Sequence, residues 1–125
     1  MRIMTDTIFR LQPSVIKSLK SYAPPLVYSI DQEIHYEGHI PIVGYLILDG
    51  QIKLTKNDRL KLVLEAGHLF GLTELMNRMP FDFTAKVSKQ SRICYLDRST
   101  ILEIMESEDQ LSRQFLDSVL CDQNA

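Results

Sequence analysis

"GYLILDGQIKL", residues 44–54, decides the fold class, because two short β-type runs flank an Asp-Gly pair. The first run is apolar, and the second alternates apolar with polar side chains in the two-residue period of a strand. Asp49-Gly50 between the runs predicts a tight hairpin, since glycine adopts the positive φ that such turns require. The stretch therefore predicts two consecutive antiparallel strands.

A second turn extends this hairpin into a meander. Asn57-Asp58 precedes "RLKLVL", residues 59–64, so a third strand is expected after it. Alternation along that strand turns three leucines toward the core, namely Leu60, Leu62 and Leu64. Similar short runs at residues 26–30, 33–37, 81–87 and 92–96 bring the expected total to roughly seven or eight strands.

Helical spacing frames these strands at both ends. Apolar residues recur at helical spacing from Leu11 to Tyr22, with Pro13 in the first turn. Beyond Leu96 the period returns to 3.6, which predicts a helix capped by Asp97 or Ser99 and a second helix opened by a Ser107/Gln110 capping box. We expect one domain over residues 1–125, with a helix at about 11–22, a β-barrel at about 25–97 and helices at about 98–120.

Composition narrows the class of protein. The chain has 125 residues, of which 45% are hydrophobic and 24% charged, as in one soluble globular domain. A net charge of −2 without a clustered basic face argues against DNA or other polyanions as partners. Charges interrupt the apolar residues of the segment 1–12, so we expect neither secretion nor a membrane span, and a cytoplasmic location. Cys94 and Cys121 lack motif spacing and are interpreted as reduced thiols, a Cys94–Cys121 bridge being the less favoured alternative.

Four stretches taken in order carry a family resemblance: "IHYEGHIP", "GYLILDGQIKL", "LVLEAGHLFG" and "TAKV...CYLD". They resemble the cyclic-nucleotide-binding domain family, whose pattern reads approximately E-G-D, then L-Y-x-I-x-x-G-x-V, then G-x-x-F-G-E. The resemblance covers roughly residues 8–120 and implies a mainly β fold, a jelly-roll barrel with flanking helices. It also implies a phosphate-binding cassette, here residues 71–87, in which helix-start amides and an arginine hold the cyclic phosphate.

The cassette of this chain departs from the family pattern at its two main polar contacts. Leu72 stands where a glutamate usually accepts from the ribose, and Phe83 stands at the arginine position after extra residues in "NRMPFD". A buried phosphate without its cation loses about 3–5 kcal/mol, so ordinary binding of cyclic AMP or GMP is not expected. The resemblance implies a degenerate pocket of Gly71, Leu72, Thr73, Phe83, Thr84 and Ala85, with Phe83 interpreted as a core aromatic.

Two other polar residues of the cassette are weighed as substitutes. Arg78 is the candidate rescue cation, although an arginine in a polar loop is usually solvated. Glu74 is a candidate ribose acceptor displaced by two residues, but that spacing on a short helix favours surface exposure.

An enzymatic function is considered and not expected. The barrel is similar to metal-binding cupins, so we weigh His35, Glu37, His39 and His68 as ligands, but the turn at Gly38 diverts His39 and no H-x-H pair occurs. No nucleophile has a motif-spaced base, and no helix-turn-helix follows Ser107. The sequence therefore predicts no metal, no cofactor, no catalysis and no direct DNA regulation.

The remaining hypothesis is a regulatory adaptor in signalling that binds another protein, or itself, through its C-terminal helices. The apolar residues there exceed one narrow core-facing stripe, and the candidate surface consists of Leu111, Phe115, Leu116, Val119 and Leu120. Packing of these residues on the barrel is the simpler alternative. The alternative function is a sensor for an unusual nucleotide or a less charged ligand, with Leu72 and Phe83 lining an apolar pocket.

Overall fold

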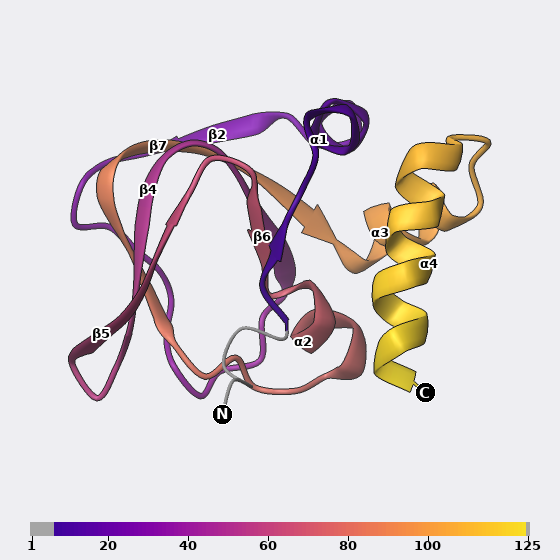
Figure 1. Ribbon diagram of the computed structural model, residues 1–125. Coiled ribbons are helices and arrows are strands. Elements are labelled where there is room, and N and C mark those ends of the chain that lie inside the picture. Colours follow the sequence, from indigo (N-terminus) through magenta and orange to yellow (C-terminus); the bar gives the residue numbers. More distant parts are fainter. Residues whose placement is uncertain (1–6, 125) are drawn as a thin grey trace.

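The computed structural model describes residues 7–124. Figure 1 shows the strands gathered into a rolled sheet, with α3 and α4 beside it and α1 near one end. The elements in chain order are β1 (Phe9–Arg10), α1 (Pro13–Lys20), β2 (Pro25–Tyr28), β3 (Glu33–His35), β4 (Val43–Lys56), β5 (Arg59–Glu65), β6 (His68–Phe70), α2 (Leu72–Asn77), β7 (Thr84–Asp97), α3 (Arg98–Met105) and α4 (Gln110–Asn124).

The sheet is antiparallel and is built around two long strands. Its seven strands follow the order β1-β6-β4-β7-β2, with β3 added to β7 and β5 added to β4. β4 and β7 have 14 residues each and pair from Val43 opposite Asp97 to Thr55 opposite Thr84. This confirms the predicted class, a mainly β jelly roll with flanking helices.

The predicted hairpin at Asp49-Gly50 is wrong, because β4 runs through both residues without turning. Gly50 does have a positive φ of 97°, but it lies at a shift in the register between β4 and β7 and not in a turn. A Cβ on Gly50 would lie 2.0 Å from Ser91 Oγ and 2.6 Å from the carbonyl oxygen of Gln90. The glycine therefore permits two strands distant in sequence to approach each other closely, rather than a local reversal of the chain.

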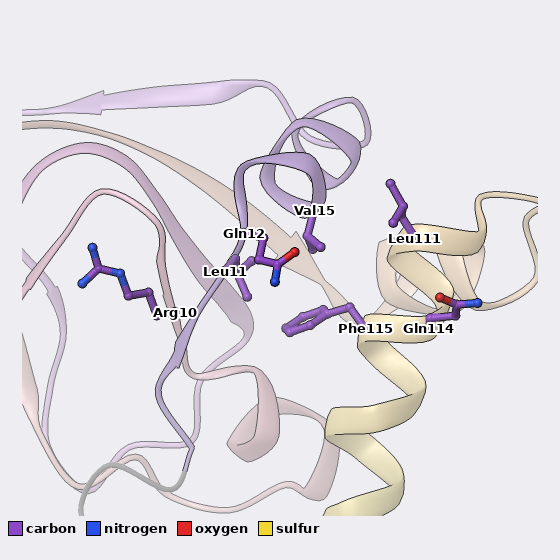
Figure 2. A pocket seen from close by; sticks show the side chains of 7 residues that line it. All are labelled: Arg10, Leu11, Gln12, Val15, Leu111, Gln114 and Phe115. Atoms are coloured by element: carbon purple, nitrogen blue, oxygen red, sulfur yellow. The ribbon is translucent and has the colours of Figure 1, made fainter.

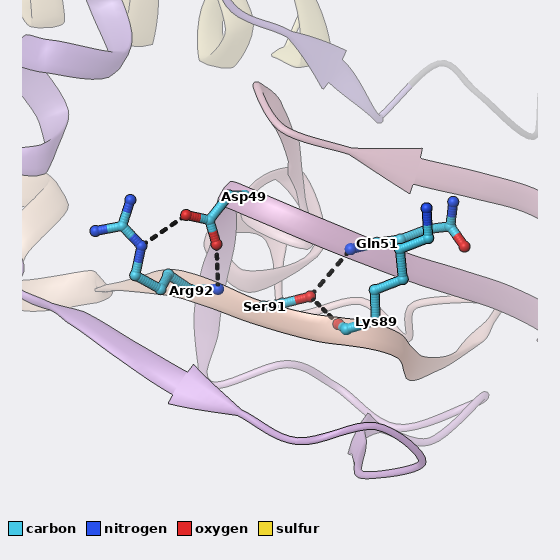
Figure 3. Close-up of polar contacts among 5 residues, drawn as sticks. All are labelled: Asp49, Gln51, Lys89, Ser91 and Arg92. Atoms are coloured by element: carbon cyan, nitrogen blue, oxygen red, sulfur yellow. Dashed lines mark hydrogen bonds and ion pairs between the residues drawn. The ribbon is translucent and has the colours of Figure 1, made fainter.

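Side chains replace the backbone hydrogen bonds lost at this irregularity (Figure 3). The Asp49 carboxylate accepts from the backbone amide of Arg92 at 3.1 Å and from its Nε at 2.7 Å. The amide of Gln51 donates to Ser91 Oγ at 3.0 Å, and this buried hydroxyl donates to the carbonyl of Lys89 at 2.6 Å. The interrupted ladder is thus satisfied by hydrogen bonds from the neighbouring side chains.

The second predicted turn is confirmed. Asn57 and Asp58 have φ values of 53° and 63° and join β4 to β5, as a two-residue hairpin of the I′ type requires. The register slips just before this turn, with Leu54 opposite Leu62 but Thr55 opposite Leu60. Alternation is broken there, so Leu64 is buried and Leu62 half-buried as predicted, whereas Leu60 is exposed, contrary to the prediction.

Helix starts follow local capping, with one correction. Pro13 opens α1, and the Asp97 carboxylate caps α3 by accepting from the amide of Thr100 at 2.8 Å, which lowers the pKa of Asp97. The cap of α4 is Asp109, whose carboxylate accepts from the Ser112 amide at 3.2 Å. Ser107 instead accepts from the Asp109 amide at 3.1 Å, so the predicted Ser107/Gln110 box does not form.

Alternation along β4 and β7 divides the buried side chains into two clusters, because neighbouring residues of a strand face opposite sides of the sheet. The barrel core, enclosed by the rolled sheet, contains Val43, Tyr45, Ile47, Ile52, Leu54, Leu64, Phe70, Phe81, Phe83, Ala85, Val87 and Ile93. The helical core, between the sheet and the helices, contains Leu11, Leu19, Ala23, Leu46, Leu69, Leu72, Cys94, Leu96, Ile101, Ile104, Leu116 and Val119.

Candidate ligand site

The candidate cassette begins at a glycine that nothing larger can replace easily. Gly71 has a φ of 83°, and a Cβ there would lie 3.2 Å from the Tyr45 ring and 3.3 Å from the carbonyl oxygen of Val43. Its carbonyl accepts from the amide of Leu75 at 2.9 Å, which starts α2. Gly71 thereby fixes how the cassette helix leaves β6.

Aromatic rings fill the centre of the barrel beside this helix. The rings of Tyr45 and Phe70 stack with centroids 4.8 Å apart, and Phe81 stacks on Phe70 at 5.4 Å. Phe83 meets Phe81 edge to face at 5.5 Å, and it is only 2% exposed. Burial raises the pKa of Tyr45 to about 12, so its hydroxyl stays protonated and donates to the Ile34 carbonyl. The barrel centre is therefore occupied by the protein's own side chains.

The six residues of the predicted pocket do not gather in one place. Phe83 and Ala85 point into the barrel core together with Phe81 and Val87, as the shared strand face predicts. Leu72 lies in the helical core, where it packs on the space left by Gly44. The interpretation that Leu72 and Phe83 line one apolar pocket is therefore wrong, because α2 turns Leu72 to the other side of the sheet.

The two threonines of that set have different environments. Thr84 Oγ1 accepts from the amide of Glu37 at 3.0 Å and so ties β7 to the segment after β3. Thr73 is 1% exposed, and its hydroxyl has no hydrogen-bond partner among the residues that the structure describes.

Glu74 is buried, contrary to the expected surface position. It is 6% exposed, and its Oε2 accepts from Thr7 Oγ1 at 2.7 Å, while Oε1 lacks a partner within residues 7–124. Burial raises the pKa of Glu74, and the charge of Asp82 adds to this effect. The contact with Thr7 explains the difference, since spacing along a short helix does not reveal a contact 67 residues away.

The buried carboxyl predicts a measurable pH dependence of stability. A raised folded-state pKa favours folding below the ordinary value of 4.5 and loses that contribution as the pH rises through the folded-state value. We expect Glu74→Gln to stabilise the domain by about 1 kcal/mol at pH 8 and to make no difference near pH 4. Urea denaturation at both pH values measures this, with Glu103→Gln on the exposed face of α3 as the control. Equal effects at the two pH values would contradict an ionisation cost at Glu74.

Arg78 does not enter the barrel. It ends α2 in the left-handed conformation and its side chain is exposed. Together with Arg98 it lines a shallow pocket of about 270 Å³ on the outer surface, whose other residues are Ile40, Pro41, Ile42 and Leu75. The candidate rescue cation therefore lies outside the cavity it was expected to serve.

The candidate metal ligands are dispersed. His35 Nε2 donates to the His39 carbonyl at 3.1 Å, and burial lowers the pKa of His35. A carboxylate oxygen of Glu37 accepts from the Asn57 amide at 3.1 Å, while His68 contacts Glu65. Within the described part of the chain, no three His, Cys, Asp or Glu side chains are arranged to hold a metal ion.

Cys94, the cysteine whose side chain the structure describes, lies outside the barrel core. Cys94 is a free thiol in the helical core, and burial raises its pKa. The side chain of Cys121 lies outside the described residues, so the predicted redox state of the pair is not tested.

No helix within residues 7–124 is both long enough and apolar enough to cross a membrane.

The predicted partner-binding residues on α4 separate into two groups. Leu116 and Val119 are buried in the helical core, and Leu120 packs against it. These three residues therefore follow the simpler alternative, in which α4 packs on the rest of the domain. Leu111 is 48% exposed and Phe115 is half-buried. Figure 2 shows Phe115 extending from α4 toward Leu11. A pocket of about 370 Å³ lies here, lined by Arg10, Leu11, Gln12, Val15, Leu111, Gln114 and Phe115.

Comparison with family models decides the classification. The model described as cyclic nucleotide-binding domain matches residues 25–108, which is more than half of the chain. The chain belongs to this family. The match extends from β2 through the barrel and cassette to the turn after α3, so the family's defining region includes both Leu72 and Phe83. No curated protein matches the sequence.

Solved structures show the same fold at low sequence identity. The catabolite activator protein of Thermus thermophilus superposes with a TM-score of 0.72 and 22% identity over 90% of this chain, which spans 55% of that protein. A chain from a cyclic-GMP-dependent signalling pathway that regulates bacterial phytopathogenesis gives a TM-score of 0.76 and 18% identity over 92% and 96% of the two chains. The CBD2 of PKAR bound to Sp-2Cl-cAMPS gives 0.63 and 20%, over 91% and 80%.

Proposed function

We propose that this domain is a non-enzymatic regulatory adaptor of cyclic nucleotide-binding type that does not bind cyclic AMP or GMP in the ordinary way and acts through protein contacts. The observation that carries the proposal is the buried Phe83 at the family's arginine position, packed on Phe81 inside the barrel. A phenyl ring offers no charge to a phosphate, and its burial removes the space a ligand needs.

The energetic balance supports this proposal. A cyclic phosphate that enters the barrel without its guanidinium partner loses about 3–5 kcal/mol. Displacing one phenylalanine ring into water costs about 1.5–3 kcal/mol more. Together these two costs exceed about 4 kcal/mol, which is the whole binding free energy of a ligand with a millimolar dissociation constant. A ligand of that affinity would therefore not bind in the barrel.

A ligand panel tests the proposal. A ligand at about 100 times its dissociation constant stabilises a protein by about 2.7 kcal/mol, which raises the melting temperature of a domain of this size by on the order of 10 °C. We expect no rise with cyclic AMP, cyclic GMP or a cyclic dinucleotide at about 1 mM, because Phe83 and its neighbours fill the barrel. The CBD2 of PKAR serves as the positive control with Sp-2Cl-cAMPS. A saturable rise of several degrees would replace the adaptor proposal with that of an atypical sensor.

The partner surface we propose is the pocket between the N-terminal segment and α4. Leu111 and Phe115 offer apolar surface there, and the amides of Gln12 and Gln114 border it. An exposed apolar hollow with a polar rim is typical of a docking site for a partner's side chain.

Leu111→Asp is expected to weaken association at this surface at least tenfold, because it places a charge in an apolar contact. Its effect on folding stability should stay within about 0.5 kcal/mol, since the side chain is half exposed. Analytical ultracentrifugation of the wild-type and variant chains measures self-association. A wild-type chain that remains monomeric would restrict the partner to a different protein, and an equal dimer in the variant would exclude this pocket.

A further inference from the structure

A second surface combines positive charge with exposed apolar side chains. The shallow pocket of about 270 Å³ lies outside the barrel, where the end of α2 meets the segment before β4 and the start of α3. Two arginines, Arg78 and Arg98, line it together with Leu75. The flanking Ile40 and Ile42 are 52% and 80% exposed, which is unusual for neighbouring large apolar residues.

The guanidinium of Arg98 is held in position by the backbone. Its Nη2 donates to the carbonyl oxygen of Leu75 in the last turn of α2. Within the described residues, no carboxylate pairs with the side chain of Arg98 or Arg78. The pocket therefore presents two positive charges whose remaining N–H groups have no acidic partner in that part of the chain.

Arg78 occupies a backbone position that disfavours a side chain. Its φ and ψ are 55° and 47°, the left-handed conformation at the end of a helix, where glycine or asparagine is the usual residue. A side chain costs roughly 1 kcal/mol there. Glycine would give a more stable helix end, so the arginine occupies this position at a cost in folding stability.

We propose that this pocket binds an acidic side chain of a partner protein, with an adjacent apolar side chain of the same partner resting on Ile40 and Ile42. Arginine beside apolar surface is a common centre of protein interfaces, and a guanidinium pair matches the geometry of a carboxylate. The pocket is smaller than the roughly 300–1,000 Å³ of ordinary small-molecule sites, which favours a single inserted side chain. This inference goes beyond the proposed adaptor function, since it names the partner's chemistry at a surface separate from the α4 pocket.

Selection of octapeptides from a random library on the immobilised full chain tests the inference. We expect enrichment of Asp or Glu next to Leu, Ile or Phe. The best peptide should bind Arg78→Ala at least tenfold more weakly and Arg78→Lys with an intermediate affinity. Arg59→Ala is the matched control, because Arg59 is also exposed but lies at the start of β5 and does not line this pocket. A selection without acidic enrichment, or equal binding by Arg78→Ala, would overturn the inference.

Arg78→Gly separates recognition from structure. We expect this variant to lose peptide binding while its melting temperature rises by a few degrees, because glycine relieves the left-handed backbone. A binding loss accompanied by a lower melting temperature would overturn the inference. Binding of AMP that depends on Arg78, without any binding of peptides, would overturn it as well. Repeating the cyclic-nucleotide panel on Arg78→Ala shows whether any rise in melting temperature comes from the barrel or from this pocket, so failure of the adaptor proposal remains distinguishable.

Discussion

Gly50→Ala is expected to remove at least about 4 kcal/mol of folding stability, a large share of the roughly 5–15 kcal/mol that a domain has. The added Cβ would collide with backbone atoms of β7, since Ser91 Cα and the Gln90 carbonyl oxygen both lie 2.6 Å from its position. The positive φ of 97° adds a further cost. Moving β7 away would break the hydrogen bonds that Ser91 makes at the register shift.

Gly38→Ala isolates the backbone part of this effect. Gly38 also has a positive φ, 84°, but a Cβ there would meet nothing within 4 Å. We expect it to cost only about 1 kcal/mol. Urea denaturation followed by circular dichroism measures both variants. If Gly50→Ala costs no more than Gly38→Ala, the close approach of β4 and β7 does not depend on the missing side chain.

Phe83→Arg, which restores the family's arginine, is expected to destabilise the protein severely. The change removes a ring that is 2% exposed from the barrel core and puts an unpaired charge in its place, at a cost of about 4 kcal/mol or more. Combining it with Leu72→Glu adds a second buried charge in the helical core, so the two costs should be nearly additive. Neither variant is therefore a simple route back to nucleotide binding.

Phe83→Leu provides the matched control, because it retains an apolar side chain and leaves only a small cavity. Its expected cost is about 1–2 kcal/mol. Urea denaturation gives the stabilities, and a melting scan with cyclic AMP shows whether any variant has gained a site. A stable Phe83→Arg protein that is further stabilised by cyclic AMP would contradict the expected cost of the buried charge, and it would show that Phe83 alone keeps the ligand out of the barrel.

Local sequence patterns predict the elements of this fold well and their pairing poorly. Asn57-Asp58 and Asp49-Gly50 carry the same signal for positive φ, and both pairs contain such a residue. Only the first pair makes a turn. The second pair lies where the register between β4 and β7 shifts. Because β7 begins more than thirty residues later in the chain, the role of Asp49-Gly50 depends on this long-range register and not on local composition.

The candidate site was predicted only in part, because local patterns fix the face of a strand residue but not its long-range contacts. The alternation of "FDFTAKV" predicts Phe83 inside the barrel, because the strand period fixes the face of each side chain. The face of Leu72 and the burial of Glu74 are set by the direction of α2 and by contact with Thr7. The outer pair of Arg78 and Arg98 likewise comes together only through tertiary contacts across twenty positions of the chain.

The long ladder between β4 and β7 also has a kinetic consequence. The two strands cannot pair until the whole segment between them has closed on itself, from residues 55 and 84 at one end to 43 and 97 at the other. The β4–β5 hairpin, closed by Asn57-Asp58, can form within about 1–10 μs, whereas a β architecture dominated by distant contacts typically folds in roughly milliseconds to seconds. We therefore expect the rate of folding to be limited by closure of the chain between β4 and β7, and not by formation of the Asn57-Asp58 turn.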